Sequence, residues 1–419
     1  MEYLKIYGGR KLNGELEMPS SKNAILPILG ACLLFRDKVE ILNFPNFLDC
    51  ELLLEMLKGF GIKCKKSENG VILDCSNIFF NSIDKNLSSK LRGSFYLFPT
   101  MLRRFGKGEI SYPGGCKIGK RPINFSLDAF KQMGVKIELQ EFLVIGEQKK
   151  ERQSNIVLPF PSVSATINVI LYACCGSKIV NIYNCAKEPE IVDLVNFLNL
   201  SGANIVGAGR DIITIFGINK LLNSVVYKCI GDRIIAGTFL LATCACFGNV
   251  KLNNAKFYYL SCVLDVLRLM GASVKTKSNS IEIQVLKRLK NVENVQTNPY
   301  PYFPTDLQPQ LMALSCVNYG KSTITENVFE SRFGSVKEFE KMGAKIVIEK
   351  NNAKIYGKRE LKGADVYACD LRSGAGLVIL GLYAKGETKI FNLHHIDRGY
   401  FQIEKDFQTL NAKIIREIQ

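Results

Sequence analysis

The stretch LMGASV (269–274) shows the local pattern that decides the fold. An amphipathic run ends at Met270, Gly271 follows it, and residues of alternating hydrophobicity come next, which predicts a surface helix, a left-handed cap and a strand. The same junction recurs as GFGIKC (59–64), QMGVKI (132–137), LSGANI (200–205), KMGAKI (341–346) and TLNAKI (409–414). The cap positions are spaced by 68 to 73 residues, at Gly61, Gly134, Gly202, Gly271, Gly343 and Asn411.

A second series of segments runs in step with these junctions. Each is apolar almost all round and is followed by a glycine turn or a short alternating strand, as in NAILPILGACLLF, SATINVILYACCG and AGTFLLATCACFG. We therefore predict a buried helix in each of six units of about seventy residues. The sequence lacks the GxGxxG opening of a dinucleotide fold and the regular alternation of an eightfold barrel. The predicted fold is α/β with two lobes of three units, one comprising residues 1–21 and 231–419 and the other residues 22–230.

The composition predicts a globular protein with a positive field. Hydrophobic residues make up 47% of the 419 residues, and the formal net charge is +16. That charge is compatible with nucleic-acid binding, with attraction of small polyanionic substrates, or with lysine-rich solvated faces. Lys and Arg are scattered, and no zinc finger or RNP-like motif is present. The longest apolar run (23–35) is too short to span a bilayer, and the N-terminus lacks a signal-peptide core, so we expect a cytoplasmic protein without membrane contact.

The fourteen cysteines are spread over a long chain without a CxxC pair, and only two histidines are present. This pattern argues against zinc and iron–sulfur sites, so we expect no metal. Most of the cysteines are expected to be reduced and buried as small hydrophobic residues.

Polar and charged residues stand where each buried helix is expected to begin. The positions are Lys22-Asn23, Arg92-Gly-Ser94, Ser162-Val-Ser164, Asp232-Arg233, Thr305-Asp306 and Asp370-Leu-Arg372. Ser, Thr, Asp and Asn are ordinary helix caps. A cation at this end of a helix is unfavourable by up to about 1 kcal/mol. The cations among these residues therefore indicate a bound anion, shared with the free backbone N–H groups.

A second set of candidate residues follows the first strand of several units. It comprises Cys116 with Arg121, Glu188, Arg332 and Arg398. If the repeat places both sets in one cleft, arginine and lysine would surround a substrate with several negative charges, including carboxylate and phosphate. Asp306 and Asp370, which stand at the helix starts, are acidic residues among these cations. They either balance charge or transfer protons.

The stretch PGGCKIGKRP (113–122) allows an ordinary turn, a metal half-site, a phosphate cradle or a lid with a reactive thiol. The absence of a second ligand cluster excludes the metal half-site. Lys117, Lys120 and Arg121 would lower the pKa of Cys116, which makes it a candidate acid or nucleophile.

These motifs together carry a resemblance. Their order and spacing are typical of the UDP-N-acetylglucosamine 1-carboxyvinyltransferase family, within the enolpyruvyl transferase superfamily. The motifs are SKNA, LRGS, PGGCKIGKRP, KEPEIVD, DRI, FPTD, FESRF, DLR and HIDRGY. The chain resembles this family over essentially its full length. The resemblance implies a two-lobed inside-out α/β barrel of six βαβαββ units. It also implies transfer of the enolpyruvyl group of phosphoenolpyruvate to the 3′-hydroxyl of UDP-N-acetylglucosamine with release of phosphate, the first committed step of peptidoglycan synthesis and thus of cell wall biogenesis, cell shape and division.

The resemblance also implies roles for individual residues. Cys116 would be the lid cysteine that protonates the vinyl carbon and is alkylated by fosfomycin, and Asp306 the general base. Lys22, Arg121 and Arg398 would hold the phosphate, and Arg332 and Arg372 the carboxylate. Asn23 would contact the intermediate, and Asp370 would position these groups. The implied catalytic residues are Cys116, Asp306, Lys22, Asn23, Asp370 and Arg398. The implied substrate contacts are Lys22, Asn23, Arg92, Arg121, Pro122, Ile123, Asn124, Phe125, Ser162, Val163, Ser164, Asp306, Val328, Arg332, Arg372 and Arg398.

Other expectations follow from the same resemblance. It implies no cofactor and no metal, and it allows a 2-(S-cysteinyl)pyruvate-type adduct on Cys116. We expect a monomer that does not bind nucleic acid. Leu48 and Phe160 stand where many family members carry lysine, and Asn124-Phe125 replaces a commonly acidic–aliphatic pair beside the uracil. The alternative functions are a 3-phosphoshikimate 1-carboxyvinyltransferase and a basic nucleic-acid-binding relative.

Overall fold

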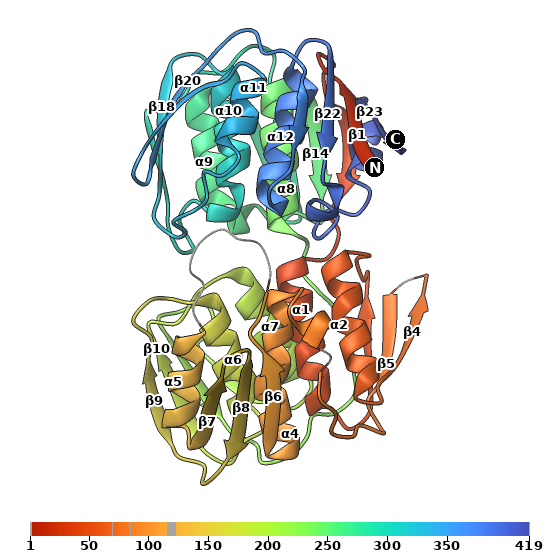
Figure 1. Ribbon diagram of the computed structural model, residues 1–419, viewed down its shortest axis with the longest axis vertical. Coiled ribbons are helices and arrows are strands. Elements are labelled where there is room, and N and C mark those ends of the chain that lie inside the picture. The colour runs from red at the N-terminus through yellow and green to blue at the C-terminus, as the bar shows by residue number, and fades with distance from the viewer. Residues whose placement is uncertain (1, 69, 84, 115–122, 419) are drawn as a thin grey trace. The chain divides into compact units, whose positions relative to one another are not determined.

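The computed structural model describes residues 2–68, 70–83, 85–114 and 123–418. These residues divide into two compact units (Figure 1). Unit 1 contains residues 2–19 and 231–418, and unit 2 contains residues 20–114 and 123–230. The boundaries predicted from the sequence lie at residues 21–22 and 230–231. Each unit holds three of the six sheets.

Unit 1 consists of three four-stranded sheets and the helices that pack on them. Its strands are β1 (Glu2–Tyr7), β2 (Asn13–Glu17), β14 (Asn249–Asn253), β15 (Ser273–Lys277), β16 (Ser280–Gln284), β17 (Asn294–Thr297), β18 (Lys321–Glu326), β19 (Lys345–Glu349), β20 (Asn352–Tyr356), β21 (Asp365–Tyr367), β22 (Glu387–Phe391) and β23 (Lys413–Ile418). Its helices are α8 (Arg233–Cys246), α9 (Ser261–Met270), α10 (Gln308–Val317), α11 (Val336–Lys341), α12 (Leu371–Tyr383) and α13 (Ile403–Thr409), with the 3₁₀ turns η3 (Phe257–Tyr259), η4 (Thr305–Leu307) and η5 (Leu393–His395).

Unit 2 repeats this plan with two four-stranded sheets and one sheet that has three strands within the described residues. Its strands are β3 (Lys38–Leu42), β4 (Lys63–Ser67), β5 (Gly70–Asp74), β6 (Lys107–Ser111), β7 (Val135–Gln140), β8 (Leu143–Gln148), β9 (Ser154–Val157), β10 (Ile179–Tyr183), β11 (Asn204–Val206), β12 (Ile212–Phe216) and β13 (Val225–Lys228). Its helices are α1 (Lys22–Ala31), α2 (Leu48–Gly59), α3 (Lys85–Ser88), α4 (Leu97–Phe105), α5 (Asn124–Gln132), α6 (Val163–Ala173) and α7 (Pro189–Leu200), with the 3₁₀ turns η1 (Cys32–Leu34) and η2 (Arg92–Tyr96).

The predicted buried helices form the core of each unit. In unit 1, α8, α10 and α12 lie side by side and contact one another (Figure 1). All residues of α8 and α10 are buried, which explains why these segments carry no polar face. In unit 2 the corresponding helices are α1, α4 and α6. The segment predicted to form α4 begins as the 3₁₀ turn η2 and becomes α-helical at Leu97.

The predicted helix caps adopt the left-handed conformation at all six positions. The backbone angle φ is +89° at Gly61, +104° at Gly271 and +72° at Asn411, and it is also positive at the other three. A residue with a Cβ is strained at such angles, and Asn tolerates them better than most. The repeat is therefore built into the chain by local backbone requirements.

Strand pairing joins segments that are distant in the sequence. β1 pairs antiparallel with both β22 and β23, so the N-terminal strand completes the last unit of the repeat. β2 pairs in parallel with β14, and β13 pairs in parallel with β3. The chain passes from unit 1 to unit 2 after residue 19 and back after residue 230. β2 and β13 lie just before these two crossings, and each pairs with a strand of its own unit.

Candidate active site

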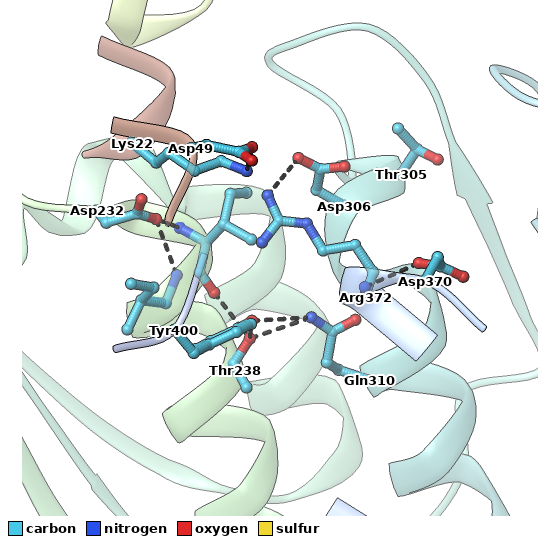
Figure 2. Close-up of polar contacts among 12 residues, drawn as sticks. Lys22, Asp49, Asp232, Thr238, Thr305, Asp306, Gln310, Asp370, Arg372 and Tyr400 are labelled. Carbon is cyan, nitrogen blue, oxygen red and sulfur yellow. Dashed lines mark hydrogen bonds and ion pairs between the residues drawn. The ribbon is translucent and has the colours of Figure 1, made fainter. Parts of the chain in front are cut away.

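In unit 1, the carboxylate of Asp306 is bound by two arginines. Its Oδ1 accepts a hydrogen bond from Nη2 of Arg332 at 2.6 Å, and its Oδ2 accepts one from Nη2 of Arg372 at 2.8 Å (Figure 2 shows the second). Arg332 and Arg372 are 2% and 6% exposed, whereas the side chain of Asp306 is 27% exposed. The carboxylate is thus the more accessible partner of two buried guanidinium groups, which form strong charge-assisted bonds with it.

The turn that carries Asp306 is fixed by Glu326 at the end of β18. One oxygen of Glu326 accepts from the hydroxyl of Thr305 at 3.0 Å, and the other accepts from the backbone N–H of Val328 at 2.9 Å. Arg332 also donates from Nε to the carbonyl of Thr305 at 3.2 Å. Leu307 packs so closely on α8 that a Cβ at Gly237 would lie 2.3 Å from its Cδ1. These contacts hold Asp306, Val328 and Arg332 in one region.

Arg372 is positioned by the helix start that Asp370 caps. Oδ1 of Asp370 accepts from the backbone N–H groups of Arg372 at 2.8 Å and Ser373 at 3.2 Å, and Oγ of Ser373 accepts from the backbone N–H of Asp370 at 3.0 Å. This is a reciprocal capping box. Burial is the largest single influence and opposes the charge of Arg372, but the combined attraction of Asp306, Tyr400 and Asp232 outweighs it and raises the pKa of Arg372. Arg372 therefore stays cationic while it is buried.

Asp232 caps the neighbouring helix α8 and adds another carboxylate to the unit 1 cluster. Its Oδ1 accepts from the backbone N–H groups of Ile234 at 2.8 Å and Ile235 at 2.9 Å (Figure 2). The residue is 5% exposed, and its charge contributes to the raised pKa of Arg372. The helix-start pattern points to Asp232 as a cap, and the structure adds its electrostatic effect on Arg372.

In unit 2, Lys22 forms an ion pair with Asp49. Nζ of Lys22 lies 3.1 Å from Oδ2 of Asp49, and the two residues are 9% and 3% exposed. Lys22 begins α1, and the preceding Ser21 donates its backbone N–H to the carbonyl of Ile230 at 2.8 Å. Asp49 lies in the first turn of α2 and is absent from the predicted site. Its sequence context indicates only an acidic residue near a helix start, because the partner is 27 residues away.

A pocket in unit 2 collects five of the predicted substrate contacts. They are Arg92, Ile123, Phe125, Ser162 and Ser164. Ser162 caps α6 with its hydroxyl, which accepts from the backbone N–H of Ala165 at 3.3 Å. The pocket also contains side chains that the sequence analysis missed, namely Phe95, Tyr96, Ser126 and Asn168, together with Ala165. Asn168 is fully buried and donates to the hydroxyl of Ser126 at 3.0 Å, and its Oδ1 has no hydrogen-bond partner among the described residues.

Other predicted residues lie elsewhere or outside the described part of the chain. Cys116, Arg121 and Pro122 lie outside the described residues. Asn124 begins α5 and is exposed, whereas Asn23 and Val163 are half-buried in the first turns of α1 and α6. Leu48 and Phe160, which depart from the family pattern, are exposed at 42% and 38%.

The described residues contain no group of three or more His, Cys, Asp or Glu side chains arranged to hold a metal ion. None of the thirteen cysteines in the described part of the chain forms a disulfide there, and ten of them are buried. In the part of the chain that the structure describes, no helix combines the length and apolar character needed to cross a membrane.

Comparison with solved structures places the fold in a known class. An enolpyruvyl transferase, NikO from Streptomyces tendae, matches with a TM-score of 0.89 and 23% sequence identity over 99% of this chain and 98% of that one. EPSP synthase from Acinetobacter baumannii matches with a TM-score of 0.77 and 15% identity over the full length of both chains. The fold is therefore that of the enolpyruvyl transferases, the two-lobed inside-out α/β barrel with six repeated units.

Sequence comparison identifies the family. The family model described as EPSP synthase (3-phosphoshikimate 1-carboxyvinyltransferase) matches residues 6–407. UDP-N-acetylglucosamine 1-carboxyvinyltransferase 2 of Clostridium tetani is 41% identical over 99% of this chain and 100% of its own length. UDP-N-acetylglucosamine 1-carboxyvinyltransferase of a Wolbachia from Brugia malayi is 41% identical over 97% of both chains. The chain belongs to the UDP-N-acetylglucosamine 1-carboxyvinyltransferase family, within the wider group of EPSP-synthase-like transferases.

Proposed function

We propose that this protein transfers the enolpyruvyl group of phosphoenolpyruvate to the 3′-hydroxyl of UDP-N-acetylglucosamine. A proton adds to the vinyl CH₂ carbon, and the sugar oxygen bonds to the neighbouring carbon after losing its own proton. The resulting tetrahedral ketal then loses phosphate from that carbon and a proton from the methyl group, which restores the double bond. The products are the enolpyruvyl ether of the sugar nucleotide and inorganic phosphate.

The main structural support is the cluster of Asp306, Arg332 and Arg372. Two buried guanidinium groups already bind a carboxylate there, at 2.6 and 2.8 Å. Arginine forks suit carboxylates, so the same pair is a natural site for the carboxylate of phosphoenolpyruvate. Asp306 itself, 27% exposed in its side chain, can act as the base that takes the proton of the sugar hydroxyl.

These two roles are linked by the geometry. While both arginines bind Asp306, each of its oxygens accepts a charge-assisted hydrogen bond, so both oxygens are engaged before substrate arrives. A substrate carboxylate that takes over the two arginines would release these bonds and strengthen Asp306 as a base. Substrate binding and activation of the base then become one event.

The remaining roles follow the family resemblance. Lys22, Arg121 and Arg398 bind the phosphate, and their charges stabilise its departure without a metal. Cys116 protonates the vinyl carbon. The pocket that contains Arg92 and Phe125 suits a nucleotide, because it offers a cation and the N-terminus of α6 for phosphate and aromatic side chains for a flat base.

The reaction is tested by measuring phosphate release from phosphoenolpyruvate with each of two acceptors. We expect release with UDP-N-acetylglucosamine and none with shikimate 3-phosphate. Shikimate 3-phosphate is the second acceptor because the matching family model is that of a 3-phosphoshikimate 1-carboxyvinyltransferase. Activity with shikimate 3-phosphate alone would refute the proposal. Salt-sensitive RNA binding that UDP-N-acetylglucosamine does not displace would instead support the nucleic-acid alternative suggested by the net charge.

The role of Cys116 is tested by substitution and by mass spectrometry after treatment with fosfomycin. We expect a single adduct on Cys116, loss of turnover in Cys116→Ser, and retained activity without fosfomycin inactivation in Cys116→Asp, because a carboxyl group also donates a proton. Buried Cys316, replaced by Ala, serves as a control that keeps the adduct. Normal turnover of Cys116→Ala would show that the thiol is not the acid.

A further inference from the structure

Arg398 lies in a tight turn at the end of the segment HIDRGY. The backbone N–H groups of Gly399 and Tyr400 both donate to the carbonyl of Ile396, at 3.1 and 3.0 Å. Arg398 is half-buried, whereas Ile396 and Tyr400 on either side of it are 0% and 2% exposed. The backbone position from which the Arg398 side chain extends therefore depends on how this turn is held.

On one side, the turn is held by the Tyr400 network, which consists of Tyr400, Thr238 and Gln310 (Figure 2). The hydroxyl oxygens of Tyr400 and Thr238 are 2.7 Å apart, and Nε2 of Gln310 lies 3.1 Å from the Thr238 oxygen and 3.5 Å from that of Tyr400. Thr238 donates its single hydroxyl proton to the carbonyl of Ile234 at 2.9 Å. Tyr400 must therefore be the donor in its bond with Thr238, since a threonine hydroxyl carries one proton.

The Tyr400 network connects the turn to two core helices. Thr238 lies on α8, which Asp232 caps, and Gln310 lies on α10, directly after the η4 turn that contains Asp306. Thr238 and Gln310 are fully buried. Burial raises the pKa of Tyr400 above its ordinary value, although the charge of Arg372 opposes the shift, so the hydroxyl remains a neutral donor.

On the other side, the turn is held by an ion-pair cluster around Arg416 of β23. Its Nη2 and Nη1 donate to the two oxygens of Asp397 at 2.7 and 3.0 Å, and its Nε donates to Glu404 at 3.2 Å. The side chains of Asp397 and Arg416 are 29% and 19% exposed. Solvent reaches this cluster, whereas Thr238, Gln310 and Tyr400 are buried.

We infer that Tyr400, through its bonds with Thr238 and Gln310, is a positioning residue that aims Arg398 at the phosphate of phosphoenolpyruvate. This inference rests on the proposed function, which assigns Arg398 to that phosphate. A flexible arginine stabilises a departing anion best when its backbone is fixed in advance, because no reorganisation is then needed during the reaction. The Tyr400 network meets this need without adding a charge that would compete for Arg398.

The test compares Tyr400→Phe with Tyr383→Phe. Tyr383 lies at the far end of α12 and donates its hydroxyl to the carbonyl of Arg359 at 2.5 Å, so both variants lose one hydrogen-bonded hydroxyl in unit 1. Isothermal titration with inorganic phosphate, the KM for each substrate and the melting temperature are measured for both variants. For Tyr400→Phe we expect about a tenfold weaker affinity for inorganic phosphate and a similar rise in the KM for phosphoenolpyruvate. The KM for UDP-N-acetylglucosamine and all constants of Tyr383→Phe should stay near those of the wild type.

Equal weakening of both substrates, or a lower melting temperature with unchanged phosphate affinity, would overturn the positioning role. If Tyr400→Phe does not fold, Thr238→Val and Thr238→Ser test the same bond, because only serine keeps the hydroxyl. Weaker phosphate binding in Thr238→Val but not in Thr238→Ser supports the inference. Equal phosphate binding by the two Thr238 variants refutes it. Failure of the wild-type enzyme to release phosphate would refute the proposed function instead. The direct titration of phosphate would still compare the two tyrosine variants.

Discussion

The predicted site residues differ in kind between the two units. In unit 1, Asp306 is bound by Arg332 and Arg372, and Asp370 and Asp232 cap the adjacent helices, so the charges are fixed by one another. In unit 2, the largest group of predicted residues lines a pocket of aromatic, hydroxyl and amide side chains around Arg92. The difference suggests a division of labour. Substitutions in the unit 1 cluster should change the chemical step, and those in the unit 2 pocket should change nucleotide affinity.

The largest effect is expected for Asp306→Asn. Loss of the base should lower kcat by about 10² to 10⁴. The variant also removes the carboxylate that occupies both arginines, so the dissociation constant for phosphoenolpyruvate, measured by titration, should decrease several-fold. Asp365→Asn, at an exposed position of β21, is the matched control and should match the wild type. A weaker affinity for phosphoenolpyruvate in Asp306→Asn would show that Asp306 orients the arginines and does not compete with the substrate.

A smaller and different effect is expected for Arg92→Ala in the unit 2 pocket. Loss of one charged contact to a phosphate group should raise the KM for UDP-N-acetylglucosamine about tenfold or more, with kcat within about twofold of the wild type. Steady-state kinetics with each substrate varied in turn provide the measurement. Arg210→Ala removes an exposed arginine from the same unit and should leave both constants unchanged. A fall in kcat with unchanged KM for Arg92→Ala would contradict the division of labour between the units.

The third effect concerns stability and leaves the chemistry unchanged, and it contrasts the arginine-bound Asp306 with Asp406, whose pKa is shifted by burial. Burial, and to a lesser extent the charge of Glu404, raise the pKa of Asp406 in α13 to about 6. The folded state therefore binds this proton more tightly than the unfolded chain, whose aspartates have pKa values near 3.9. The stabilisation is complete below about pH 4 and is lost as the pH rises through about 6.

Asp406→Asn should therefore stabilise the protein at pH 7.5 by on the order of 2 kcal/mol and have little effect at pH 4. Melting temperatures of both proteins across this range give the measurement. The same gain at every pH would show that the ionisation of Asp406 is not its cause. Asp306, which has two arginine partners, should show no such gain when replaced by Asn.

The sequence predicts structure well at positions where the local backbone conformation or a helix start restricts which residue can stand there. Gly61, Gly271 and Asn411 could be identified as caps because a left-handed backbone angle excludes most residues. The starts of the buried helices were also predicted, since the change from capping to apolar residues is a local signal. The same signal identifies Asp306, Asp370 and Arg372 as candidates without knowledge of their contacts.

The sequence was less informative where a role depends on a distant partner. Asp49 meets Lys22 across 27 positions, and Tyr400 meets Thr238 across 162. Neither residue stands out in its own segment, because an acid in a first helical turn and a tyrosine after a glycine are common. Asn168 is similar, since an amide inside an apolar helix shows no function until a pocket surrounds it.

By itself the sequence determined the six repeats, their buried helices and the positions of the charged helix starts, because backbone strain and hydrophobic periodicity act over a few residues. Only the tertiary structure decided that β1 completes the last unit with β22 and β23, that Asp306 is shared by Arg332 and Arg372, and that Tyr400 holds the turn of Arg398. These arrangements depend on which segments meet after the chain has folded. The bonds involved are between residues far apart in the sequence, where no local pattern marks the partner.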